Sequence, residues 1–177
     1  MLFTRAICGV FGSLCVLPLE MLQLTWETGR IPRVRPVTEL GLSCAGGAIA
    51  YAMQSTAREK LSPPWSTVVT VAVLTPIAVT GQYTRLRARL GAKQLKCAFV
   101  ACVAAREGVL YGTLFALDSC IYAPLLAHLI AYPLKLLSVG CCVPVRIRPL
   151  AMVCEIVKAS LALWCSAWLE GHTVNRS

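Results

Sequence analysis

Several charged residues lie inside long apolar stretches of the chain, where ionisable side chains often mark a site for an ion or a polar ligand, and three of them are the most informative. Arg106 and Glu107 are neighbours in the stretch from Leu95 to Leu117, and Lys158 lies between Leu150 and Leu169. A charge at the centre of a bilayer costs about 2.5–3.5 kcal/mol or more, so each residue needs a partner or a water-filled cavity. The chemistry open to these residues is therefore ion pairing or the binding of a charged ligand.

A structural interpretation of the same charges needs only nearby acids. Arg106 can pair with Glu107 or Glu155, and Lys158 can pair with Glu155, three residues earlier on the same helix face, or snorkel to the interface. No Ser-His-Asp set, phosphate-binding loop or facing pair of carboxylates occurs, so the sequence offers no case for an enzyme. His128 stands in an apolar stretch without a second ligand, and we expect a packed neutral imidazole and no metal site.

The composition predicts the element type that must position these charges. Of the 177 residues, 57% are hydrophobic and 14% are charged, and the mean hydropathy is +0.68. A soluble domain carries roughly 25% charged residues, so lipid is the expected solvent for most of the surface. The ten cysteines lie mainly in apolar stretches and form no C-x-x-C pair. We expect them to be reduced small hydrophobes, with the vicinal Cys141–Cys142 open as a redox pair.

The chain is expected to be one transmembrane domain, residues 1–177, that is entirely α-helical. Each apolar stretch is close to the roughly 20 residues that a transmembrane helix requires. A four-span arrangement, with two stretches lying in the interface or re-entrant, stays open because several stretches are barely long enough. The six stretches run from Leu2 to Thr25, Leu40 to Ala57, Trp65 to Tyr83, Leu95 to Leu117, Ile121 to Val143 and Leu150 to Leu169.

The basic residues between these stretches predict an orientation. Three alternate loops hold nearly all of them, whereas the opposite loops hold Arg58 and Lys60 beside Glu59, and Asp118. Positive residues favour the cytoplasm-like or matrix side, so both termini are expected on the other side. The net charge of +9 is explained by these loops, and no nucleic-acid partner is expected. The basic loop residues are Arg30, Arg33, Arg35, Arg85, Arg87, Arg89, Lys93, Lys96, Arg146 and Arg148.

Evenly spaced prolines indicate an internal repeat. Pro18, Pro76 and Pro133 are separated by 58 and 57 residues, and each stands in an odd-numbered apolar stretch that precedes a basic loop. The fourth and sixth stretches also align, since Arg106 precedes Asp118 by 12 residues and Lys158 precedes Glu170 by 12. The spacing predicts three two-helix repeats, approximately residues 1–60, 61–118 and 119–177.

Three helix pairs with a proline in each odd helix resemble the mitochondrial carrier family, whose odd helices carry Pro-x-[Asp/Glu]-x-x-[Lys/Arg]. The first repeat keeps Pro18 and Glu20, with Gln23 in place of the base. The second repeat keeps only its proline, and in the third Lys135 takes the place of the acid after Pro133. The resemblance implies six transmembrane helices as three two-helix repeats with a pseudo-threefold arrangement.

The resemblance also implies roles for individual residues. In the family, the motif acids and bases pair across the central axis and close the matrix side of the cavity. Here only Glu20 and Lys135 remain as such a pair, helped by Gln23. Positions on the even helices contact substrate in the family, which implies an anion or zwitterion site at Arg106, Glu107 and Lys158, active or relic.

Several features predict close helix packing. The Gly108-x-x-x-Gly112 spacing matches a helix-packing motif, as do Gly9 with Gly12 and the small-residue cluster at 45–48. Such spacing predicts that helices approach closely without naming the partner helix.

The three-repeat arrangement is kept, while most of the acids and bases that would close the gate are absent. This combination leads to a functional expectation. The chain is expected to be a non-transporting, carrier-like accessory subunit of a mitochondrial inner-membrane assembly such as a respiratory-chain complex, with its basic loops facing the matrix. Its expected partners are membrane lipid and other subunits, with no cofactor beyond a bound phospholipid such as cardiolipin. One alternative is a minimal mitochondrial carrier for an amino acid or small carboxylate. A second is a four-span inner-membrane translocase component.

Overall fold

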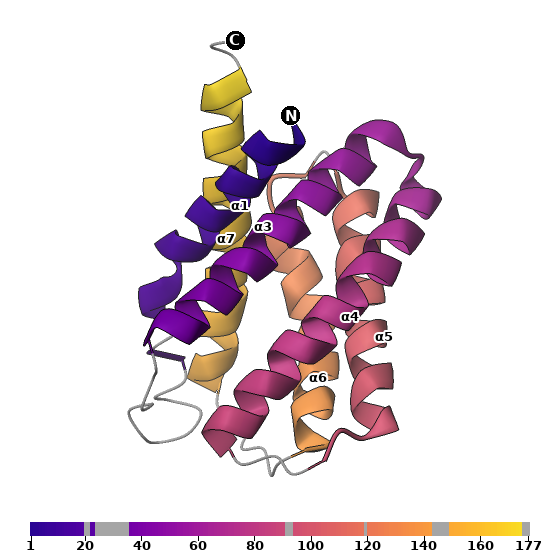
Figure 1. Ribbon diagram of the computed structural model, residues 1–177. Helices are drawn as coiled ribbons and strands as arrows, with labels where there is room; N and C mark the ends of the chain where they lie inside the picture. Colours follow the sequence, from indigo (N-terminus) through magenta and orange to yellow (C-terminus); the bar gives the residue numbers. More distant parts are fainter. Residues whose placement is uncertain (20–21, 24–35, 91–93, 119, 143–148, 175–177) are drawn as a thin grey trace.

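The computed structural model describes residues 1–19, 22–23, 36–90, 94–118, 120–142 and 149–174, and these residues form helices and short connections with no strand among them (Figure 1). The all-α expectation is confirmed for this part of the chain. The helices are α1 (Leu2–Cys15), α3 (Pro36–Lys60), α4 (Pro63–Leu90), α5 (Cys97–Ala116), α6 (Ala123–Gly140) and α7 (Pro149–Val174).

Proline marks where several of these helices begin. Pro36, Pro63 and Pro149 are the first residues of α3, α4 and α7, and Pro124 is the second residue of α6. The first turn of a helix tolerates proline because its backbone N–H groups have no intrahelical partner, and the fixed φ angle suits a helix start. These four prolines therefore define helix boundaries.

The helices close into a ring. Each helix packs against its neighbours in the chain, and α1 also packs against α7. The two chain ends lie at one end of the bundle together with the α3–α4 turn, as Figure 1 shows. We call this the terminal end and the opposite one the basal end. Because α7 returns to α1, the bundle has an interior that every described helix borders.

In the described part of the chain, four helices are long and apolar enough to cross a membrane, which indicates a multi-pass membrane protein. Helix α1 is apolar but has only 14 residues, and the rest of the first predicted stretch lies partly outside the described residues. Helix α3 has 25 residues but does not meet the apolarity that the other four share. The spanning helices are Pro63–Thr84, Cys97–Ala116, Ala123–Gly140 and Pro149–Thr173.

The repeat prolines occupy two different helical contexts. Pro76 lies inside α4 and Pro133 inside α6, both on exposed surface. Pro18 lies just beyond α1, which ends at Cys15. An internal proline removes one backbone hydrogen bond and favours a kink. The expected repeat boundaries fall at the α3–α4 turn and at the turn between α5 and α6.

The main apolar core fills the space between α3, α4, α5 and α6. Leu110 and Leu114 of α5 meet Leu74 of α4, and the small residues Ala127 and Ala131 of α6 are almost fully buried against them. Small residues one turn apart let α6 approach α5 closely. This packing fixes the positions of the charged residues on α5 and α6.

The close glycine contacts lie on α1, not on α5. A Cβ added at Gly9 would lie 2.7 Å from the carbonyl carbon of Gly47, and one at Gly12 would clash with the backbone of Ala162. By contrast, a Cβ added at Gly108 meets open space, and one at Gly112 has only an ordinary contact with a threonine methyl at 3.8 Å. Among the described residues, no neighbouring backbone lies against Gly108 or Gly112, and the packing role expected for them stays a prediction, because the motif specifies a spacing but not the face that meets a neighbour.

Candidate functional site

Near the basal end, one buried carboxylate is held by two lysines. Oε2 of Glu155 on α7 lies 2.9 Å from Nζ of Lys135 on α6 and 2.9 Å from Nζ of Lys158, one turn along α7. Glu155 is only 8% exposed. The two cations that lie against this carboxylate balance its charge. The expected pairing of Lys158 with Glu155 is confirmed.

A residue of the first repeat joins these three. Nζ of Lys158 donates a hydrogen bond of 2.9 Å to Oε1 of Gln23, which is buried. We call Gln23, Lys135, Glu155 and Lys158 the Glu155 cluster. The predicted partner of Lys135, Glu20, lies outside the described residues. The carrier motif does not include the position of Glu155, so the sequence indicates this residue only as an ion-pair partner of Arg106 or Lys158.

Arg106 and Glu107 form a pair at the middle of α5. Nη1 of Arg106 donates to Oε1 of Glu107 at 2.9 Å, and the Glu107 side chain is 6% exposed. Arg106 also lies within electrostatic reach of Glu155, so the structure brings it toward the Glu155 cluster. Glu107 is one of the two partners, with Glu155, assigned to Arg106 by the structural interpretation of the sequence.

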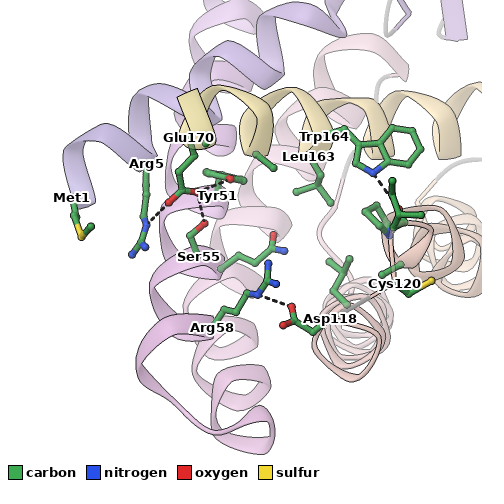
Figure 2. A pocket seen from close by; sticks show the side chains of 17 residues that line it. Met1, Arg5, Tyr51, Ser55, Arg58, Asp118, Cys120, Leu163, Trp164 and Glu170 are labelled. Atoms are coloured by element: carbon green, nitrogen blue, oxygen red, sulfur yellow. Dashed lines mark hydrogen bonds and ion pairs between the residues drawn. The ribbon is translucent and has the colours of Figure 1, made fainter. Parts of the chain in front are cut away.

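A second polar cluster joins α1, α3 and α7 at the terminal end. Oε1 of Glu170 accepts from Nε of Arg5 at 2.9 Å, while its Oε2 accepts from Tyr51 at 2.7 Å and from Ser55 at 3.3 Å. Arg5 also pairs with Glu59 at 2.6 Å. Figure 2 shows the side chains of Arg5, Tyr51 and Ser55 converging on Glu170 of α7. We call these four residues and Glu59 the terminal network.

Sequence reasoning assigned no role to the terminal network. Arg5 and Glu170 are 165 residues apart, so no local spacing connects them. The available signal was that each is a lone charge at the outer end of an apolar stretch. Such a charge needs a partner or water, and the ring closure between α1 and α7 supplies the partner.

A pocket of about 520 Å³ opens beside the terminal network. Helices α1, α3 and α7 and the α5–α6 turn contribute its walls, and we call it the mouth pocket (Figure 2). Arg58 of α3 and Asp118 after α5 form an ion pair on one side. The indole of Trp164 donates to the backbone oxygen of Ile121 at 3.3 Å and connects α7 with the turn before α6.

The mouth pocket and the Glu155 cluster are separate sites. Glu155 and Glu170 are 15 residues apart on α7, which corresponds to about 22 Å along the helix. The described lining of the mouth pocket includes neither Arg106 nor Lys158. The residues expected to bind a substrate therefore do not line the mouth pocket.

The cysteines and His128 were candidates for redox chemistry and metal binding. All ten thiols are free. At the end of α6, burial raises the pKa of the Cys142 thiol, and the adjacent Cys141 adds to the shift. A thiol with a raised pKa is a poor nucleophile because the thiolate is the reactive form. His128 lies on α6, and no group of three possible metal ligands comes together in the described part of the chain.

Comparison with family models, curated proteins and solved structures found no match to this chain. The resemblance to mitochondrial carriers remains an interpretation of the sequence.

Proposed function

We propose that the chain is a carrier-like structural subunit of a mitochondrial inner-membrane assembly, without transport activity of its own. The observation that carries the proposal is how the interior charges pair. Arg106 pairs with its neighbour on α5, and Lys158 pairs with Glu155 on α7. Neither pair is broken when helices move relative to one another. Such pairs neutralise charge inside the bundle, but they cannot act as a gate between repeats.

A third interior ion pair joins two helices of one repeat. Lys135 and Glu155 lie on α6 and α7, which together form the third repeat of the proposed arrangement. Glu155 lies 2.9 Å from Nζ of both Lys135 and Lys158, so one carboxylate balances two buried cations. This mutual neutralisation supports a structural role for the three charges.

The proposal includes six membrane-crossing helices in three repeats. Support comes from the closed ring, in which α1 and α3 take the same neighbouring positions as the four apolar helices. The prolines inside α4 and α6 occupy the odd-numbered helices of the second and third repeats, as the spacing requires. Arg87 near the end of α4 and Lys96 before α5 lie at the basal end, and by the positive-inside rule the proposal orients that end toward the matrix.

Purification of the tagged chain from mitochondria in a mild detergent tests the proposal. A structural subunit migrates with a large complex on a native gel and is recovered at a fixed ratio to the other subunits. The purified chain in liposomes is expected to exchange no labelled amino acid or carboxylate above the rate of empty vesicles. Exchange at carrier-like rates, or recovery of the chain free of any complex, would contradict it.

A minimal carrier is the second candidate, and the mouth pocket is the observation that favours it. The pocket opens within the ring at the terminal end, where a substrate could enter. This reading requires that Arg106→Ala and Lys158→Ala abolish uptake while the protein remains folded. Equal loss of folding in both variants would remove the support for a substrate site, because the two cations would then serve only to balance buried acids.

A further inference from the structure

Exposed aromatic residues gather at the terminal end of the bundle. They stand at the start of α1, at the start of α4, on the turn before α6 and in the last part of α7. Tryptophan and tyrosine are enriched at the level of lipid headgroups, where their rings meet both apolar and polar surroundings. The terminal end therefore lies at a membrane interface. The aromatic side chains exposed by more than a third, among the described residues, are Phe3, Trp65, Tyr122, Trp164 and Trp168.

The mouth pocket opens at this same level. Its lining includes Trp164 and Ile121, which are 37% and 71% exposed, so the pocket continues to the outer surface of the bundle. Leu114 and Leu163 line it on the inner side. Its volume of about 520 Å³ falls within the roughly 300–1,000 Å³ of small-molecule sites. A ligand here has an apolar exit toward the membrane and polar groups within the pocket.

The charges of the lining are balanced and of both signs. Arg5 and Glu170 stand on one side, and Arg58 and Asp118 on the other. Arg5 and Glu170 are largely buried and hold each other in the terminal network, whereas the Arg58 and Asp118 side chains are 57% and 48% exposed. A half-exposed ion pair contributes little to stability. Arg58 and Asp118 can therefore give up their mutual contact and pair with the two charges of a zwitterionic ligand at a small cost in free energy.

We propose that the mouth pocket binds the headgroup of a phospholipid of the phosphoethanolamine type. The phosphate lies against the guanidinium of Arg58, whose planar set of N–H donors suits phosphate oxygens. The primary ammonium donates to the carboxylate of Asp118. The acyl chains leave past Ile121 and Trp164 into the bilayer. A choline headgroup lacks N–H donors, and an anionic headgroup meets the carboxylate, so both bind more weakly.

The test uses the full chain in nanodiscs that hold phosphatidylethanolamine, phosphatidylcholine and phosphatidylglycerol in equal parts, with bound lipid read by native mass spectrometry. The wild-type chain is expected to retain phosphatidylethanolamine in preference to the other two. Arg58→Gln is expected to lower retention about five- to tenfold, the loss of one charge-assisted contact. Asp118→Asn is expected to remove the preference for ethanolamine over choline and to raise retention of the anionic lipid.

Two controls make the result decisive. Arg87→Gln changes an exposed arginine at the other end of α4 and is expected to leave lipid retention unchanged. Soluble glycerophosphoethanolamine keeps the phosphodiester and the ammonium, so it carries the same charges without acyl chains, and it is expected to displace little lipid. Equal retention of all three lipids, or unchanged retention in Arg58→Gln and Asp118→Asn, overturns the proposal. Retention of the soluble compound in place of the lipid assigns the pocket to a water-soluble zwitterion and also overturns it.

Discussion

Replacement of Glu155 by glutamine is the sharpest test of the charge arrangement inside the bundle. The substitution keeps the size of the side chain but removes the anion that lies 2.9 Å from both Lys135 and Lys158. Because Glu155 is only 8% exposed, water cannot replace it easily. Removal of one partner from a buried ion pair typically costs 3–5 kcal/mol, and we expect a loss of about 3 kcal/mol in the free energy of unfolding.

The assay is equilibrium unfolding in mixed micelles, followed by tryptophan fluorescence. A matched control is Glu59→Gln, which removes an acid that pairs with Arg5 at 2.6 Å but whose side chain is 47% exposed. The loss there is expected to stay below about 1 kcal/mol. Adding Lys158→Gln to Glu155→Gln removes one of the two lysines and should recover about half of the loss. If Glu155→Gln is no more destabilising than the control, the carboxylate of Glu155 is not needed to neutralise Lys135 and Lys158.

Three further predictions concern packing, the terminal network and topology. Gly47→Ala forces α1 and α3 apart and is expected to cost about 1–3 kcal/mol, whereas Gly46→Ala next to it meets open space and stabilises the helix by about 0.5–1 kcal/mol; thermal unfolding compares the two. Tyr51→Phe removes a 2.7 Å hydrogen bond to a carboxylate and should lower stability by about 1.5–3 kcal/mol in the micelle assay. Single cysteines at Lys60 and Arg87, in a chain without native cysteines, should react with an impermeant maleimide from opposite sides of sealed vesicles, and labelling from the same side would show that α4 does not span.

Local spacing predicted the contacts that lie within a helix, and little beyond them. Lys158 and Glu155 are three residues apart, so helical geometry alone brings them together, and the sequence indicated that pair. The contact between Arg5 and Glu170 depends on the closure of α1 against α7, which no local pattern encodes. Apolar composition predicted the helices, because length and hydropathy determine whether a helix can span.

The glycine motifs show that a small-residue spacing does not by itself identify the helix face that packs against a neighbour. Gly9 and Gly108 each belong to a small-residue motif, but only Gly9 faces a neighbouring backbone within the chain. Which face of α5 turns inward is decided by its larger side chains, and Leu110 and Leu114 point that face toward α4 and α6. The position of the bulky residues around a helix therefore selects among the small-residue motifs that its sequence offers.

The two ends of the bundle differ in what their ion pairs connect, and this difference bears on whether the ring can open. At the terminal end, Arg5 binds Glu170 and joins α1 to α7, while Arg58 binds Asp118 and joins α3 to the turn after α5. Near the basal end, Glu155 joins α7 to Lys135 of α6. The contact of Arg5 with Glu170 is largely buried, whereas a half-exposed pair such as Arg58 with Asp118 contributes little to stability. The ring therefore opens at the terminal end only if α1 separates from α7, and that separation must break the Arg5–Glu170 pair.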